Sequence, residues 1–192
     1  MRAIPSYNRD NRDDHGRDDR TDLSAPTVPA PAAPRHLGLR VVLIIAALRE
    51  GFDARSSVPT LFGDMSEIPG PGFGGFLIKA HIATHAPLAL AVLVFAIIGR
   101  VRYAIIALAA IVFMTWLNYM PSVVRHGLEF GGIGAFETPA HIIAFPLLAA
   151  CAIALAARNQ RLRLATALAS IPTFYSLVGV IIFAIGVSIY GF

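Results

Sequence analysis

The sequence has few of the features on which soluble proteins depend. Only 15% of its 192 residues are charged and 56% are hydrophobic, whereas soluble domains have charge on about 25% of their residues. A single cysteine, Cys151, excludes an intramolecular disulfide. The chain also lacks the G-x-S-x-G nucleophile motif and the C-x-x-C-H haem-attachment motif. These absences argue against a soluble domain, a disulfide-stabilised domain and a covalently attached haem.

Long runs without charge are the main feature that is present. Leu88–Gly99 and Leu164–Phe192 contain no charged residue, and Val101–Leu117 contains only Arg102. Such apolar segments predict transmembrane helices, so we expect an integral membrane protein in contact with the lipid bilayer. The basic residues lie at the ends of these runs and not in one patch, which indicates membrane orientation and no nucleic-acid partner.

The first 35 residues differ from the rest of the chain. Residues 1–22 are polar, with acidic and basic side chains that nearly cancel, and residues 21–35 are rich in proline and alanine. Neither composition can bury a hydrophobic core. We therefore divide the chain into a disordered cytoplasmic tail, residues 1–35, and a transmembrane helical domain, residues 36–192.

The helical domain is expected to be all-α, a membrane bundle of five transmembrane helices. Their approximate ranges are residues 37–52, 76–98, 102–124, 139–157 and 162–190. The first is the weakest, because its uninterrupted apolar stretch, Val41–Leu48, reaches only about 12 Å against a hydrocarbon core of about 30 Å. An interfacial or re-entrant helix is the alternative. Arg49 and Glu50 are expected to pair with each other near one interface.

Glycine and proline predict the breaks between these helices. Residues 53–75 are rich in Gly, Pro and Ser and are expected to form a loop. The third helix is expected to end near Pro121, which places His126 in the next loop. Pro172 is a candidate kink in the last helix.

Arginine is distributed unequally between the two ends of the predicted bundle. One end contains only basic residues: Arg35, Arg40, Arg100, Arg102, Arg158, Arg161 and Arg163. At the other end four basic residues are mixed with six acidic ones. Cytoplasmic loops are enriched in Lys and Arg, so we expect a multi-pass protein of the cell inner membrane with a cytoplasmic N-terminus and an external C-terminus.

Histidines form a pattern in the second and fourth predicted helices. His81 and His85 are four residues apart, which places both rings on one helix face. The segment "AHIATHAPLALA" at 80–91 resembles "AHIIAFPLLAA" at 140–150, so His141 corresponds to His81. This weak repeat predicts that helices two-three and four-five are parallel copies. His81, His85 and His141 then lie at the same, outer, end of the bundle.

These histidines suggest a b-type haem, because membrane cytochromes ligate haem iron with imidazoles from different helices of a bundle. His81 and His141 are the expected axial ligands if their helices are neighbours, and His85 is the alternative ligand. Such a chain would be an electron-transfer protein or subunit that relays electrons between a quinone and a partner membrane protein. It would not catalyse a reaction alone.

Two other interpretations stay open. A membrane enzyme could hold a metal ion through His81, His85 and His141 together with Glu137 or Glu50, because histidines at i and i+4 can chelate. A structural or accessory subunit would bind no cofactor, and its histidines would form a polar rim at the membrane surface. An ion or proton carrier is disfavoured, because no charge is expected deep in the spans.

Other polar residues are expected to have structural roles. Trp116 and Tyr119 lie near one end of the third helix, where aromatic residues anchor helices at the membrane interface. Thr173 and Ser176 in the last helix are expected to pack against neighbouring helices or to line a cavity.

Overall fold

The computed structural model describes residues 36–62, 72–128 and 137–191. Within these ranges the chain is helical apart from short turns, and it contains no strand. The predicted all-α fold class is therefore confirmed. The predicted disordered tail, residues 1–35, lies outside the described residues.

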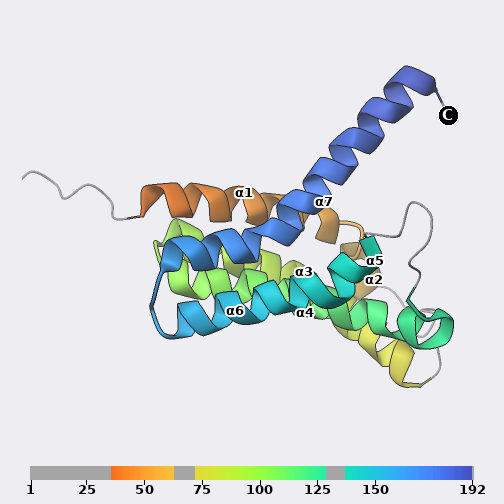
Figure 1. Ribbon diagram of the computed structural model, residues 1–192, viewed down its shortest axis with the longest axis horizontal. Coiled ribbons are helices and arrows are strands. Elements are labelled where there is room, and N and C mark those ends of the chain that lie inside the picture. The colour runs from red at the N-terminus through yellow and green to blue at the C-terminus, as the bar shows by residue number, and fades with distance from the viewer. Residues whose placement is uncertain (1–35, 63–71, 129–136, 192) are drawn as a thin grey trace, which may run out of the picture. The chain divides into compact units, whose positions relative to one another are not determined.

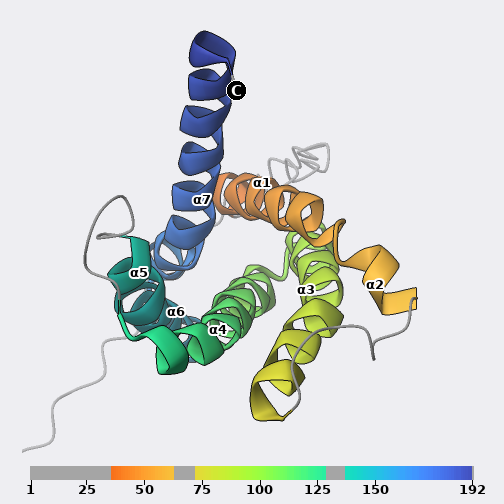
Figure 2. The same ribbon diagram turned by 90° about the vertical axis from the view of Figure 1, so that its right-hand side faces the viewer.

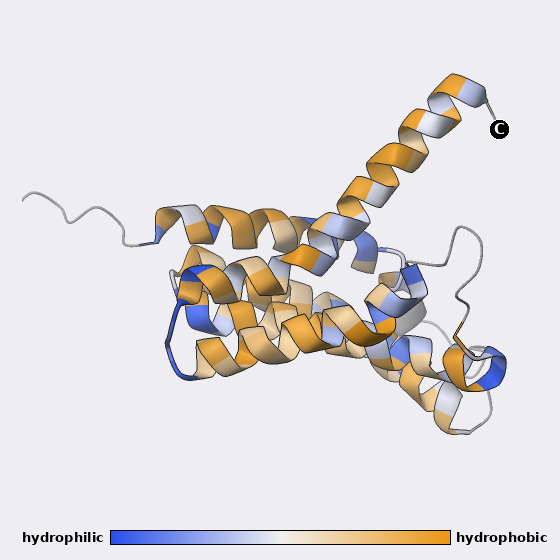
Figure 3. Cartoon of the chain, in the orientation of Figure 1, coloured by the Kyte–Doolittle hydropathy of each residue, from blue (hydrophilic) through white to orange (hydrophobic). Residues whose placement is uncertain are grey.

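Among the described residues, four helices are long and apolar enough to cross a membrane. They are α3 (Phe73–Ile97), α4 (Val101–His126), the run Glu137–Ala157 and α7 (Leu162–Tyr190). Even the shortest, with 21 residues, is about 32 Å long at 1.5 Å per residue. Figure 3 shows hydrophobic residues along these helices and hydrophilic residues mainly near their ends. The chain is thus a helical membrane protein.

The first helix, α1 (Leu37–Ala54), belongs to the same bundle. It lies alongside α3 and contacts α7 (Figures 1 and 2). Leu43 and Ala46 are fully buried against these helices, whereas Val41, Ile45 and Leu48 form an exposed apolar stripe on the opposite face. An apolar outer face is suited to lipid. The packing therefore favours a bundle helix over the interfacial or re-entrant alternative.

The five long helices form a ring in the order α1, α3, α4, α6 and α7, and α7 closes the ring on α1 (Figure 2). Here α6 (Phe145–Ala157) is the main part of the third membrane-crossing run. The core between them is rich in buried alanine: Ala46, Ala96, Ala104, Ala152, Ala165 and Ala169. Small side chains let helix backbones approach closely. The resulting van der Waals packing holds helices together inside a membrane, where the hydrophobic effect does not.

The observed helix ends lie within a few residues of the predicted ones, but two features of the predicted layout need correction. The segment predicted as a loop contains a short helix, α2 (Val58–Phe62). Helix α4 continues through Pro121, so His126 is its last residue and not part of a loop. Proline is tolerated in transmembrane helices because neighbouring groups satisfy the freed backbone carbonyl, and the sequence alone does not show such neighbours.

Helix α7 changes direction near Pro172, as predicted, and its C-terminal half leaves the bundle (Figure 1). Pro172 and Thr173 are buried among the other helices, whereas Tyr190 at the far end is 81% exposed. The buried half of α7 therefore contributes side chains to the interior, and the remainder presents apolar residues to its surroundings.

Candidate functional site

A cavity of about 190 Å³ lies inside the ring, at the end opposite the arginine-containing turns. All five long helices contribute to its wall. We call it the histidine cavity, because His81, His85 and His141 all line it together with Glu50. The prediction that these three histidines share one end of the bundle is confirmed. Their role as cofactor ligands stays a prediction.

Glu50 connects three helices within this cavity. Its Oε2 atom lies 3.0 Å from Nε2 of His85 on α3, and its Oε1 accepts a hydrogen bond of 2.7 Å from the hydroxyl of Thr173 on α7. Only 14% of the Glu50 side chain is exposed. A carboxylate in the interior requires partners of this kind, because its desolvation is otherwise costly.

The predicted pairing of Arg49 with Glu50 is wrong. Arg49 instead forms an ion pair with Asp53, one helical turn later, and donates a hydrogen bond of 3.4 Å to Ser176. The reason is helix geometry, since residues i and i+4 share a face and adjacent residues do not. Glu50 consequently faces the interior while Arg49 and Asp53 neutralise each other beside it.

The interior position of Glu50 also overturns the expectation that the bundle has no buried charge. Two carboxylates, Glu50 and Asp53, line the histidine cavity, and among the described residues no lysine or arginine does. Asp53 has Arg49 as its counter-ion. The partners of Glu50 are a histidine and a hydroxyl group, so its charge is matched only when His85 is protonated.

His81 and His85 lie beside each other along α3. Their ring centroids are 5.1 Å apart, consistent with their i, i+4 spacing. The Nδ1 atom of His81 is buried and has no hydrogen-bond partner among the described residues. Because this atom has almost no accessible surface, it does not by itself mark a ligand position.

A wide helical turn presents His141 to the cavity from the opposite side. The turn is η3 (Ala140–Ala144), which follows α5 (Glu137–Pro139) and leads into α6. Proline has no N–H, so Pro146 cannot donate to the carbonyl of Ile142 as a regular helix requires. The indole N–H of Trp116 donates to that carbonyl instead, at 3.0 Å. Single π-helical turns of this kind are frequent at functional sites.

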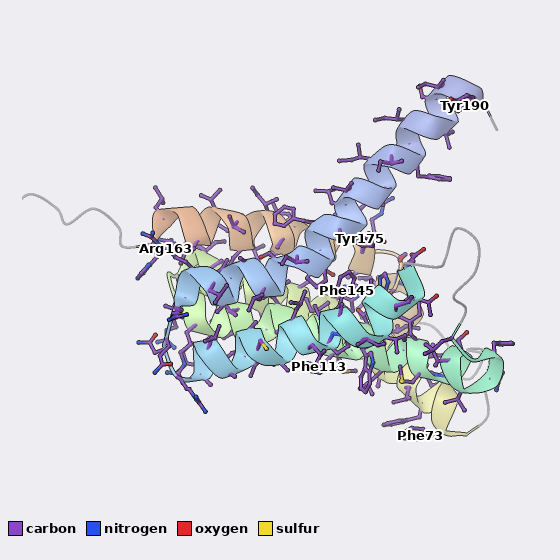
Figure 4. The ribbon with its side chains drawn as sticks, viewed as in Figure 1. Phe73, Phe113, Phe145, Arg163, Tyr175 and Tyr190 are labelled. Carbon is purple, nitrogen blue, oxygen red and sulfur yellow. The ribbon has the colours of Figure 1, made fainter. Side chains whose placement is uncertain are left out.

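Aromatic rings surround His141. Its centroid lies 5.1 Å from Tyr119 and 4.9 Å from Phe145, and the Tyr175 ring is 6.2 Å away. Figure 4 shows Phe145 and Tyr175 together where α7 leaves the bundle. The Nδ1–H of His141 donates to the carbonyl of Glu137 at 2.9 Å. The other ring nitrogen, Nε2, is then the one left for a ligand.

A second cavity of about 540 Å³ lies on the far side of His141. Its polar lining is Tyr119, Ser122, His126, Glu137, Thr138 and His141. We call it the vestibule. Tyr119 and His141 line both cavities, so their ring pair stands between them.

The haem prediction meets a geometric difficulty. Helices α3 and α6 both pack on α4, which lies between them (Figure 2), so His81 and His141 are not on directly neighbouring helices. The histidine cavity, at about 190 Å³, is also smaller than the roughly 300–1,000 Å³ of common ligand pockets. A porphyrin would require these helices to separate.

The metal prediction gains no support from the described residues. Among them, no group of three or more His, Cys, Asp or Glu side chains is arranged to hold a metal ion. Glu137 contributes its backbone carbonyl to His141, and its side chain is exposed at the vestibule.

Sequence reasoning missed two residues of the site, Trp116 and Tyr119. It named Glu50 as a possible metal ligand and Thr173 as a possible cavity-lining residue, but it did not predict the hydrogen bond between them. Trp116 and Tyr119 were predicted to be interfacial anchors, but both line the histidine cavity. No protein-family model, curated protein or solved structure matches the chain.

Proposed function

We propose that this membrane protein binds a small organic cation in the histidine cavity and exchanges it for a proton. The observation that supports this proposal is the position of Glu50, an interior carboxylate whose partners are His85 and Thr173. Ionisable residues inside membrane bundles mark substrate pathways and proton relays.

The exchange follows from the charges around Glu50. A proton on His85 neutralises the carboxylate, and so does a cation in the cavity beside it. If His85 were protonated while a cation also occupied the cavity, one positive charge would remain uncompensated in the low-dielectric interior, which is costly. Arg49 and Asp53 do not change this balance, because they neutralise each other. A cation that enters the cavity is therefore expected to release one proton.

The walls of the cavity suit an organic cation. Trp116, Tyr119 and Phe145 line it beside the carboxylate, and aromatic faces attract ammonium groups. The cavity, at about 190 Å³, is smaller than common ligand pockets, which favours a small ligand. The vestibule offers a polar route to it, past Tyr119 and His141.

Tryptophan fluorescence provides a direct test, because Trp116 is the single tryptophan and lines the cavity. The purified full chain is titrated with tetramethylammonium, and with tert-butyl alcohol as a neutral molecule of similar shape. We expect a saturable fluorescence change with the cation only, and release of up to one proton per cation, measured with a pH dye in weak buffer.

Two variants distinguish specific binding from a general effect of charge. Glu50→Gln is expected to lower affinity at least about 30-fold, equivalent to about 2 kcal/mol for a buried charge partner. Glu137→Gln removes a carboxylate at the vestibule and is expected to bind like the wild type. Equal titrations of wild type and Glu50→Gln, or a response to tert-butyl alcohol, would contradict the proposal.

A b-type haem is a second candidate, favoured by the hydrogen bonding of His141. Metal-ligating histidines usually donate their other ring N–H to a carbonyl or carboxylate, as Nδ1 of His141 does. His81 lines the same cavity. Haem would supply reversible one-electron chemistry, and the chain would then serve as an electron-transfer subunit between a quinone and a partner membrane protein.

A reduced-minus-oxidised absorption spectrum of the protein from haem-replete cells tests this candidate. A b-type band that disappears in both His81→Ala and His141→Ala supports it, and a colourless protein rules it out. A colourless protein that also binds no cation would leave the structural or accessory subunit as the remaining interpretation.

The proposed location is the cell inner membrane, with the N-terminus in the cytoplasm. The arginines at the ends of short turns support this orientation. It places the histidine cavity in the outer half of the membrane, so the proposed ligand would enter from outside the cytoplasm.

A further inference from the structure

We propose that a groove at the arginine-containing end of the bundle binds the phosphate group of an anionic phospholipid. The groove has a volume of about 670 Å³ and joins the start of α1 to the turn between α6 and α7. It is lined by His36, Asn159, Arg161, Leu162, Arg163 and Leu164. This site is separate from the histidine cavity and does not depend on the proposed function.

The polar lining of this arginine groove is basic. Arg161, Arg163 and His36 line it, and none of its lining residues is acidic. Figure 4 shows Arg163 at the end of the bundle where nitrogen-tipped side chains gather. The acidic residues that the structure describes are Glu50, Asp53 and Glu137, all at or near the opposite end. Basic pockets between transmembrane helices on the cytoplasmic side bind anionic head groups.

Two other arginines at this end, Arg40 and Arg102, have protein partners. The guanidinium of Arg40 donates to the backbone carbonyls of Ala96 and Ile97 at the end of α3. Arg102 lies over the ring of Tyr103, 5.6 Å from its centroid. Arg161 and Arg163 are both exposed and are the arginines that line the groove.

Backbone conformation supports a specific site here and not a diffuse basic surface. Three residues other than glycine have positive φ among those described: His36 at 74°, Asn159 at 52° and Arg161 at 44°. All three line the arginine groove. Asn and His are enriched in this conformation, whereas Arg161 adopts it at a cost. Such costs concentrate where the position of side chains matters for binding.

The apolar part of the groove selects a lipid over free phosphate. Leu162 and Leu164 line it next to the arginines, and Leu164 is 43% exposed. A phospholipid presents a phosphate and an acyl chain together, so it can satisfy both parts of the lining. Inorganic phosphate can satisfy only the basic part.

The test measures phosphatidylglycerol retained by the purified full chain in native mass spectrometry, with phosphatidylcholine as the neutral lipid. The variant Arg161→Gln/Arg163→Gln is compared with Arg100→Gln/Arg102→Gln, which removes the same charge from the other turn at this end. We expect phosphatidylglycerol affinity to fall about fivefold for each groove arginine removed. The Arg100/Arg102 variant is expected to retain most of its affinity.

A variant that keeps the positive charge distinguishes loss of the binding charge from misfolding. Arg161→Lys/Arg163→Lys keeps the charge, and it should restore much of the binding if the groove variant is folded. Equal losses in both glutamine variants would overturn the proposal, because they would indicate a non-specific basic surface. Equal protection from thermal unfolding by inorganic phosphate and phosphatidylglycerol would overturn the choice of a lipid.

Discussion

The Nε2 atom of His85 lies 3.0 Å from Oε2 of Glu50, across the interface between α3 and α1. Both side chains are largely buried, with 10% and 14% exposed. The other oxygen of Glu50 accepts a hydrogen bond from Thr173 on α7. One carboxylate therefore holds three helices of the ring together and lines the cavity proposed as the binding site.

Glu50→Ala is expected to destabilise the fold by about 2 kcal/mol or more, because it leaves the buried polar groups of His85 and Thr173 without a partner. Reversible unfolding of the purified protein in a denaturing detergent measures the change. The matched control is Glu137→Ala, which removes an exposed carboxylate and is expected to cost under about 1 kcal/mol. A larger loss for Glu137→Ala than for Glu50→Ala would contradict this ranking.

Trp116→Phe is expected to cost about 1–3 kcal/mol, because the carbonyl of Ile142 loses its donor. The additional variant Pro146→Ala should recover part of that loss, since it supplies the N–H that proline lacks. A double-mutant cycle with both changes measures the coupling. Strictly additive effects would show that Trp116 does not compensate for Pro146.

Arg40→Gln is expected to destabilise the bundle by about 1.5–3 kcal/mol, the range for hydrogen bonds to charged groups. The lost bonds are those to Ala96 and Ile97, which hold the end of α3 against α1. Arg158→Gln, an exposed arginine at the same end, serves as the control and should unfold like the wild type. The same unfolding assay compares the two.

Cysteine labelling tests the proposed orientation. In a Cys151→Ser background, Leu128→Cys lies beyond the end of α4, and Gln160→Cys lies in the turn between α6 and α7. A membrane-impermeant thiol reagent added to intact cells or spheroplasts should label Leu128→Cys at once. Gln160→Cys should be labelled only after the membrane is permeabilised, and the reverse pattern would show the opposite orientation.

Much of the fold could be predicted because a long uncharged segment in a membrane has few alternatives to a transmembrane helix. The third helix was expected over residues 102–124 and extends over Val101–His126. The alternation of spans also places His81, His85 and His141 at one end, since serial helices cross the membrane in opposite directions. Helix α1 was harder to assign, because its charged residues Arg40, Arg49 and Glu50 shorten its apolar run.

The partners of the site residues could not be predicted in the same way. The hydrophobic residues of α3 and α6 are spread over all sides of each helix, so their pattern does not indicate which face turns inward. Glu50 had two possible partners by sequence, its neighbour Arg49 or a group on another helix.

The sequence by itself determined that the chain crosses a membrane and that its histidines share one end, because hydrophobic length and loop charge are local properties. Only the tertiary structure decided that Glu50 reaches His85 and Thr173, and that α4 lies between the helices of His81 and His141. Those relationships depend on how each helix is rotated about its axis and on which helices are neighbours in the ring. Both are set by the packing of small residues across helix interfaces.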